Sequence, residues 1–191
     1  MGRHTEHMRI YVPATLDELD SAVVARSTTH WTVTARRAHA VTAALAAALG
    51  DEDDEGREYA AFLAAAHDSL ELVAGRADVP PLRVVVSLDV PETAVALPDR
   101  GSDSGIDGRA AASAVLVTRE VRDVPVIAIH VDEPEAAADI RAVLAAADEE
   151  GDAESATDVA DPSVLDGALQ RVEDHDLLWY DGSEVHQIPR P

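Results

Sequence analysis

The sequence predicts one α+β domain: a mixed β-sheet with helices packed on it and a C-terminal β-hairpin. Its 191 residues suit a single globular domain. Apolar residues make up 47% of the chain, which is enough for a hydrophobic core. Segments rich in β-forming residues also alternate with amphipathic helical segments in an irregular order. That irregular order is more typical of an α+β fold than of a regular parallel α/β fold.

The first 75 residues are expected to contain short strands and three helices. Residues 10–12 are β-forming and end at Pro13, and Thr15 and Glu18 have the spacing of a capping box. This spacing predicts a first helix that ends near Ala25. The other expected elements are strands at 31–34 and 39–42, an alanine-rich helix ending at Gly50, and a helix with an apolar stripe of Tyr59, Phe62, Leu63, Ala66, Leu70 and Val73.

The second half of the chain contains further strands and two helices that begin with proline. Pro134 and Pro162 each stand at the expected first position of a helix, where proline is favoured. Strands are expected at 82–88, 94–97, 113–118 and 124–131. Asp181-Gly182 lies between two β-rich runs, a pattern that predicts a two-residue hairpin turn.

The predicted domain spans residues 8–191. Residues 1–7 are expected to form a disordered extension before a start at Met8. A flexible, glycine-rich loop is expected at 98–112 and an acidic linker at 148–160. The glycine-rich loop lacks the strand-to-helix context of a phosphate-binding loop, so no nucleotide site is expected there.

The charge of the chain restricts its partners. Thirty-seven acidic residues face fifteen basic ones, all of them arginine, and the net charge is −22. Nucleic acids and anionic membranes are therefore poor partners. Residues 131–181 hold sixteen acids and two arginines, so a basic protein surface is a candidate partner. The same charge could also serve only to keep the protein soluble.

The missing residue types exclude several kinds of chemistry. The chain has no cysteine and no lysine, which excludes disulfides, thiolate sites and Schiff-base catalysis. We expect no cofactor. Residues 1–7 contain no apolar signal segment, so a cytoplasmic location is expected.

His130 is the first candidate for a functional residue. It interrupts an apolar strand and stands just before Asp132 and Glu133. A histidine beside carboxylates could be a general base or a metal ligand. The more ordinary interpretation is a histidine at the rim of the sheet, with the two acids capping the next helix.

Two arginines could bind an anionic small molecule. Arg36 and Arg37 belong to the one basic cluster of the sequence and could hold a carboxylate or phosphate in a bidentate manner. They could equally pair with acids of the same chain, as surface arginines commonly do.

His175 and His186 could form a weak metal site. If Asp181-Gly182 forms a two-residue turn, Leu177 faces His186 and His175 faces Ile188, so the two histidines come close. A solvated strand end is the alternative, because metal ligands need further support from neighbouring groups.

Several segments resemble an uncharacterised protein family of GC-rich actinobacteria. The resemblance covers nearly the whole chain from Met8. It implies a single domain and gives no activity, cofactor or catalytic residue. The segments that carry it are residues 8–16 (MRIYVPATL), 39–42 (HAVT), 58–61 (EYAA), 130–132 (HVD) and 174–180 (DHDLLWY).

Two functions remain open from the sequence. The first is a non-catalytic cytoplasmic binding or regulatory protein that uses an acidic surface. The alternative is a small-ligand-binding protein or an enzyme with its site near His130, Asp132 and Glu133. A concave pocket with convergent polar groups would favour the second function, and a flat acidic face would favour the first.

Overall fold

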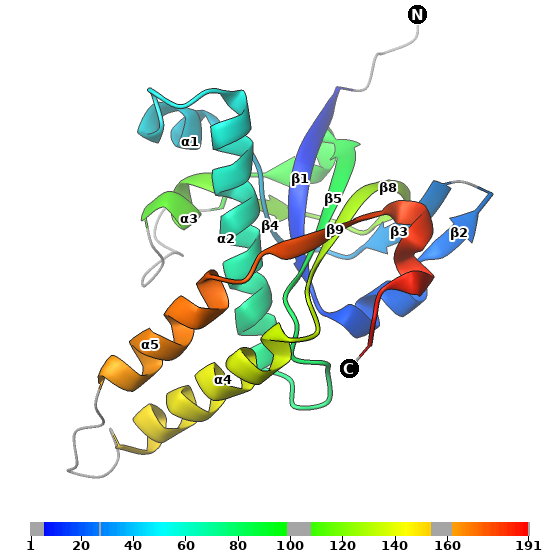
Figure 1. Ribbon diagram of the computed structural model, residues 1–191. Coiled ribbons are helices and arrows are strands. Elements are labelled where there is room, and N and C mark those ends of the chain that lie inside the picture. Colours follow the sequence, from blue (N-terminus) through cyan, green and yellow to red (C-terminus); the bar gives the residue numbers. More distant parts are fainter. Residues whose placement is uncertain (1–5, 27, 99–107, 154–161, 191) are drawn as a thin grey trace, which may run out of the picture.

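The computed structural model describes residues 6–26, 28–98, 108–153 and 162–190. These residues form one α+β domain built on an open sheet (Figure 1). The sheet has nine strands in the described residues: β1 (His7–Ala14), β2 (Val23–Ala25), β3 (Thr28–Val33), β4 (Arg36–His39), β5 (Val84–Pro91), β6 (Val95–Ala96), β7 (Ala114–Val117), β8 (Val121–Asp132) and β9 (Leu177–Asp181).

The order of the strands is β2-β3-β8-β5-β1-β4-β7-β6, with β9 also paired to β8. Strand β8 is twelve residues long. The first part of one edge of β8 pairs with β3, and the last part of that edge pairs with β9. Strand β9 is therefore an edge strand beside the second half of β8.

Helices cover the two faces of the sheet unequally. Five α-helices are described: α1 (Ala43–Ala48), α2 (Asp54–Ala74), α3 (Gly108–Ser113), α4 (Ala136–Ala153) and α5 (Pro162–Glu173). Helix α2 lies across one face and packs on β1, β4 and β5. On the other face, the main core is closed by the 3₁₀ helices η1 (Leu16–Ser21) and η3 (Gly182–Gln187). A third 3₁₀ helix, η2 (Glu92–Ala94), precedes β6.

Helices α4 and α5 pack side by side and extend away from one end of the sheet (Figure 1). Their apolar residues form a second cluster with Leu70 and Val73, which lie near the end of α2. The pair connects β8 to β9, so the chain leaves one end of the sheet along α4 and returns to that end along α5.

The sheet is antiparallel, and the prediction of a mixed sheet is wrong in this respect. Every strand pair of the described residues is antiparallel. The α4–α5 connection shows one reason. A single crossover helix would carry the chain to a parallel neighbour, whereas two helices return it to the end at which it left.

The predicted C-terminal hairpin is also wrong. Asp181 accepts a hydrogen bond from Ser183 N at 2.9 Å, and Glu184 accepts one from Asp181 N at 2.9 Å. This capping box begins η3. A Cβ at Gly182 would lie 3.0 Å from Val126 O and 3.3 Å from Val126 Cβ, so glycine permits η3 to approach β8 closely.

Other boundaries also differ from the predictions. The capping box at Thr15 is present, but it begins η1, and the chain forms β2 at residues 23–25, where a helix was expected. The expected loop at 98–112 includes the start of α3 at Gly108, and the expected linker at 148–160 includes the end of α4 at Ala153. Strand β1 begins at His7, inside the expected extension, because Glu6 O accepts a hydrogen bond from Glu92 N. The remaining parts of these segments, 1–5, 99–107 and 154–161, lie outside the described residues.

No helix within the described ranges is long and apolar enough to cross a membrane.

Substituting Gly182→Ala tests the close approach of η3 to β8. The added methyl group must displace Val126, so we expect the free energy of unfolding to fall by about 1–3 kcal/mol. Gly75→Ala is the matched control, because a Cβ there meets its nearest atoms at 3.7 Å, an ordinary contact. Urea denaturation measures both variants, and equal stability of the two would contradict the interpretation.

Candidate functional site

A groove lies on the half of the sheet face that α2 leaves uncovered. Helix α2 packs over β4, β1 and β5, whereas β8 and β9 continue beyond it on the same face. The groove has a volume of 1060 Å³. One side of α2 forms its first wall, Leu177 and Trp179 of β9 form the second, and Leu169, Val172 and Glu173 of α5 close one end.

The register of the strands sets which side chains form the floor. Tyr11 pairs with Ser87, Ser87 pairs with Ala128, and His130 pairs with Trp179. Directly paired residues project from the same face of a sheet. Ser87 and Ala128 are small and buried, so the floor lies close to the backbone of the sheet between the aromatic side chains.

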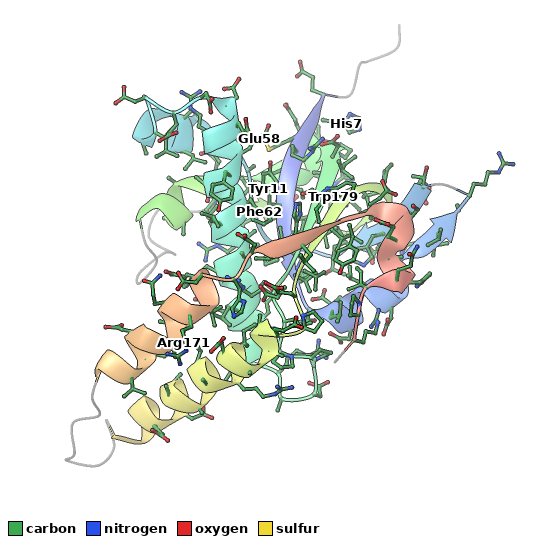
Figure 2. The ribbon with its side chains drawn as sticks, in the orientation of Figure 1. His7, Tyr11, Glu58, Phe62, Arg171 and Trp179 are labelled. Atoms are coloured by element: carbon green, nitrogen blue, oxygen red, sulfur yellow. The ribbon has the colours of Figure 1, made fainter. Side chains whose placement is uncertain are left out.

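Aromatic rings connect the α2 wall to the floor of the groove. The ring of Phe62 meets the His130 ring edge-to-face at a centroid distance of 4.7 Å and the Tyr11 ring at 6.3 Å. Tyr59 stacks on Phe62 at 6.1 Å. Figure 2 shows Tyr11 and Phe62 between α2 and the strands, with Trp179 on β9.

Large apolar side chains at the groove are exposed to solvent. Trp179 is 60% exposed, Tyr59 57% and Leu63 46%.

The predicted apolar stripe of α2 is therefore only partly buried in the core. The face of α2 that packs on the sheet is formed by alanines, among them Ala61 and Ala65, because small residues let the helix lie close to the strands. Tyr59 and Leu63 instead line the groove.

His130, the first candidate from the sequence, lines the groove. Its Nδ1 is buried and has no hydrogen-bond partner in the part of the chain that the structure describes. Burial lowers the pKa of His130, because a low-dielectric environment disfavours the charged imidazole. His130 is therefore neutral at pH 7.

Asp132 and Glu133 do not join His130 in a site. The Asp132 carboxylate is buried and is held by Arg83, which donates from its backbone N at 2.7 Å and from Nη2 at 2.7 Å. Glu133 lies 3.8 Å from His175 Nδ1. Neither acid lines the groove, so the predicted site near these three residues is reduced to His130.

Arg36 and Arg37 lie away from the groove and contact acids of the chain. The guanidinium of Arg36 donates two hydrogen bonds to the Glu18 carboxylate. Arg37 Nε lies 3.7 Å from Asp68 Oδ2. Both arginines therefore contact acids of the same chain, which is the second of the two interpretations that the sequence allowed.

His175 and His186 do not face each other, because the hairpin that would pair them is not formed. His175 Nε2 lies 2.9 Å from Asp139 Oδ2 of α4, whereas His186 is exposed on η3. The hairpin pairing on which the predicted metal site depends is therefore not formed. The described ranges contain no group of three or more histidine and acidic residues that could hold a metal ion.

Acidic residues stand at both ends of the groove. Glu55 and Glu58 lie at the first turns of α2, and Glu173 and Asp176 lie beside the opposite end. Tyr11 donates a hydrogen bond to Glu58 at 3.2 Å. Burial, and then the charge of Glu58, raise the pKa of Tyr11 to about 12. The phenol therefore stays neutral, and the negative charge of Glu58 is not compensated by it.

A buried serine, histidine and aspartate were not expected from the sequence. His39 Nδ1 lies 2.8 Å from Ser113 Oγ, and His39 Nε2 lies 2.9 Å from Asp68 Oδ2. The three residues resemble a nucleophilic triad in composition, but His39 and Ser113 are completely buried. Because no substrate can reach them, we interpret them as a polar connection between β4, α2 and α3. Because these three residues lie far apart in the sequence, no local sequence motif identifies them.

The chain matches a family model over residues 8–188. It belongs to DUF6912, a family of unknown function. No curated protein and no solved structure matches the chain. The DUF6912 model covers every residue of the groove, including His130 and Trp179, so the groove lies within the family region.

The contact between His175 and Asp139 predicts a pH dependence of stability in this DUF6912 chain. The hydrogen bond to Asp139 raises the pKa of His175 above 6.5. A raised pKa in the folded state adds stability that is complete below the unfolded pKa and is lost as pH rises through the folded pKa. We therefore expect the unfolding free energy of the wild type to exceed that of His175→Gln by most at about pH 6 and by less at about pH 8. Urea denaturation across this range tests the difference, and a constant difference would contradict it.

The buried connection through His39 predicts a large loss of stability on truncation. His39→Ala leaves Asp68 and Ser113 without their shared partner, so we expect the unfolding free energy to fall by about 2–4 kcal/mol. His67→Ala is the matched control, because His67 is exposed on α2. Thermal or urea denaturation of the two variants makes the comparison, and similar losses would rule out this role for His39.

Proposed function

We propose that the protein is a non-catalytic binding or regulatory protein whose groove holds an apolar segment of a basic partner protein. The observation that carries the proposal is the row of half-exposed Tyr59, Leu63 and Trp179 along the uncovered half of the sheet face. We also propose a cytoplasmic location, and an actinobacterial source as the resemblance of segments such as residues 8–16 and 174–180 implies.

The exposed side chains support a protein partner. Soluble proteins seldom leave large apolar side chains grouped on one surface unless another molecule covers them. Tryptophan and tyrosine are also the residues that most often dominate the binding energy of protein interfaces. Trp179 and Tyr59 stand on opposite walls, so one apolar segment between them would cover both.

The charge around the groove supports a basic partner. Two arginines line the groove, but Arg9 pairs with Asp89 and Arg83 pairs with Asp132. In the described residues Glu55, Glu173 and Asp176 form no ion pair with an arginine, and Glu58 interacts electrostatically with only one arginine, Arg9, which Asp89 already holds. A surface with this excess of negative charge attracts cationic partners and speeds their association.

The surroundings of His130 support binding over catalysis. A general base is usually oriented by a hydrogen-bonded acid or carbonyl. His130 instead packs against Phe62, with its Nδ1 unpaired. This arrangement gives the groove an apolar centre with one neutral nitrogen.

Site-specific photo-crosslinking in cells tests the proposal. A benzophenone amino acid at Leu63 should give a heavier adduct with a partner, because position 63 faces the groove. The same group at Val164, which is 57% exposed on α5 outside the groove, is the control. Replacing Glu58 and Glu173 by glutamine should weaken the adduct at position 63, since both substitutions remove negative charge. Equal adducts at both positions, or none at position 63, would contradict the proposal.

A small apolar ligand is the second candidate. The groove volume of 1060 Å³ is close to the upper end of small-molecule sites, and the His130 ring in the lining of the groove offers such a ligand an aromatic contact. A thermal-shift screen of small metabolites addresses this function. Stabilisation that is lost in His130→Ala, together with no adduct at position 63, would favour it.

A further inference from the structure

We infer that the partner segment is a basic amphipathic α-helix that lies beside α2 on the sheet. The inference rests on the proposed function and specifies its partner. It is carried by the width of the uncovered face, the length of the groove and the placement of charge along it.

The uncovered face has the width of one helix. Strands β8 and β9 are neighbours on the side of the sheet that α2 leaves open, beyond β5. Each strand takes up about 4.8 Å of the width of a sheet, so these two strands provide about 10 Å. A helix with its side chains is about 10–12 Å across. One helix would therefore fill the space between α2 and the outer edge of β9.

The length of the groove also suits a helix. The side of α2 that lines it runs from Glu55 to Leu70, about 22 Å at 1.5 Å per residue. A guest helix of about four turns has this length. The small floor residues Ser87 and Ala128 would let its backbone approach the sheet, as the alanines of α2 do on the other half of the same face.

The charge along the groove predicts where the guest carries its basic residues. Glu55 and Glu58 stand at one end, and Glu173 and Asp176 stand at the other. Phe62, Leu63 and the other apolar residues lie between them. A guest with an apolar stripe in its middle turns and arginine or lysine near both ends would match this pattern.

A guest strand fits the observations less well. Strand addition needs the free backbone groups of a sheet edge, whereas this groove is lined by side chains that project from a sheet face. A strand would also leave the width between α2 and β9 partly empty. Binding of a strand is therefore an outcome that would overturn the inference.

Fluorescence of Trp179 provides the measurement. The chain has two tryptophans, of which Trp31 is 3% exposed and Trp179 is 60% exposed. The probe is a synthetic sixteen-residue amphipathic helix of leucine and lysine. We expect a blue shift of the Trp179 emission as the peptide covers the indole. A leucine and glutamate peptide of the same pattern should produce no shift.

Leu63→Glu separates groove binding from simple attraction between opposite charges. This substitution adds a negative charge, so attraction alone would strengthen binding of the lysine peptide. If the peptide occupies the groove, its affinity should fall at least about tenfold. Val164→Glu adds the same charge outside the groove and should not weaken binding. Anisotropy of a labelled peptide measures both affinities, and circular dichroism checks that both variants are folded.

Three results would overturn the inference. They are equal affinities of Leu63→Glu and Val164→Glu for the lysine peptide, absence of binding by that peptide, and tighter binding of an alternating valine and lysine strand peptide. An adduct at position 63 in cells together with any of these results would leave the proposed function standing and reject the helix. Absence of the adduct would reject the proposed function itself.

Discussion

The ion pair between Arg83 and Asp132 holds together the strands on which the groove is built. The Asp132 side chain is completely buried, and Arg83 donates to it from its backbone and its guanidinium. Arg83 Nη2 also donates to His175 O at 3.0 Å. These bonds join the residue before β5, the end of β8 and the segment that leads into β9. The wall that carries Trp179 is therefore positioned by a charge pair in the core. Such a pair is costly to break by removing one partner, because the other charge is left buried.

The α2 wall of the groove results from a difference in side-chain size between two sides of the helix. Helix α2 turns alanines such as Ala61 and Ala65 toward the sheet and larger residues such as Tyr59 and Leu63 to its side. Small residues bring the helix close to β1 and β5, and the larger ones then stand above the neighbouring strands. A second helix beside α2 would have covered the rest of this face of the sheet. Helices α4 and α5 do not do so, because they extend from the end of the sheet.

Local signals predicted the parts of the fold that depend on neighbouring residues. Helix α2, Asp54–Ala74, contains the whole apolar spacing from Tyr59 to Val73 that predicted it. His130 was identified because it interrupts an apolar strand. Contacts between distant residues could not be predicted in this way. Arg83 and Asp132 are 49 positions apart, and Asp181-Gly182 fits a turn as well as a capping box. Only the pairing of β9 with β8 decides between these two structures, and no local pattern records that pairing.

The connection through α4 and α5 makes β9 a separable part of the sheet. Pairing β9 with β8 closes a loop of 44 residues, 133–176. Strand β8 is also held on its other edge by β5, so the remaining strands keep their ladders when β9 detaches. Edge elements of this kind open more readily than the centre of a sheet. Amide hydrogen exchange should therefore be faster in β9 than in β5. The groove keeps its full depth only while β9 is paired with β8. A molecule that fills the groove therefore also holds β9 in place.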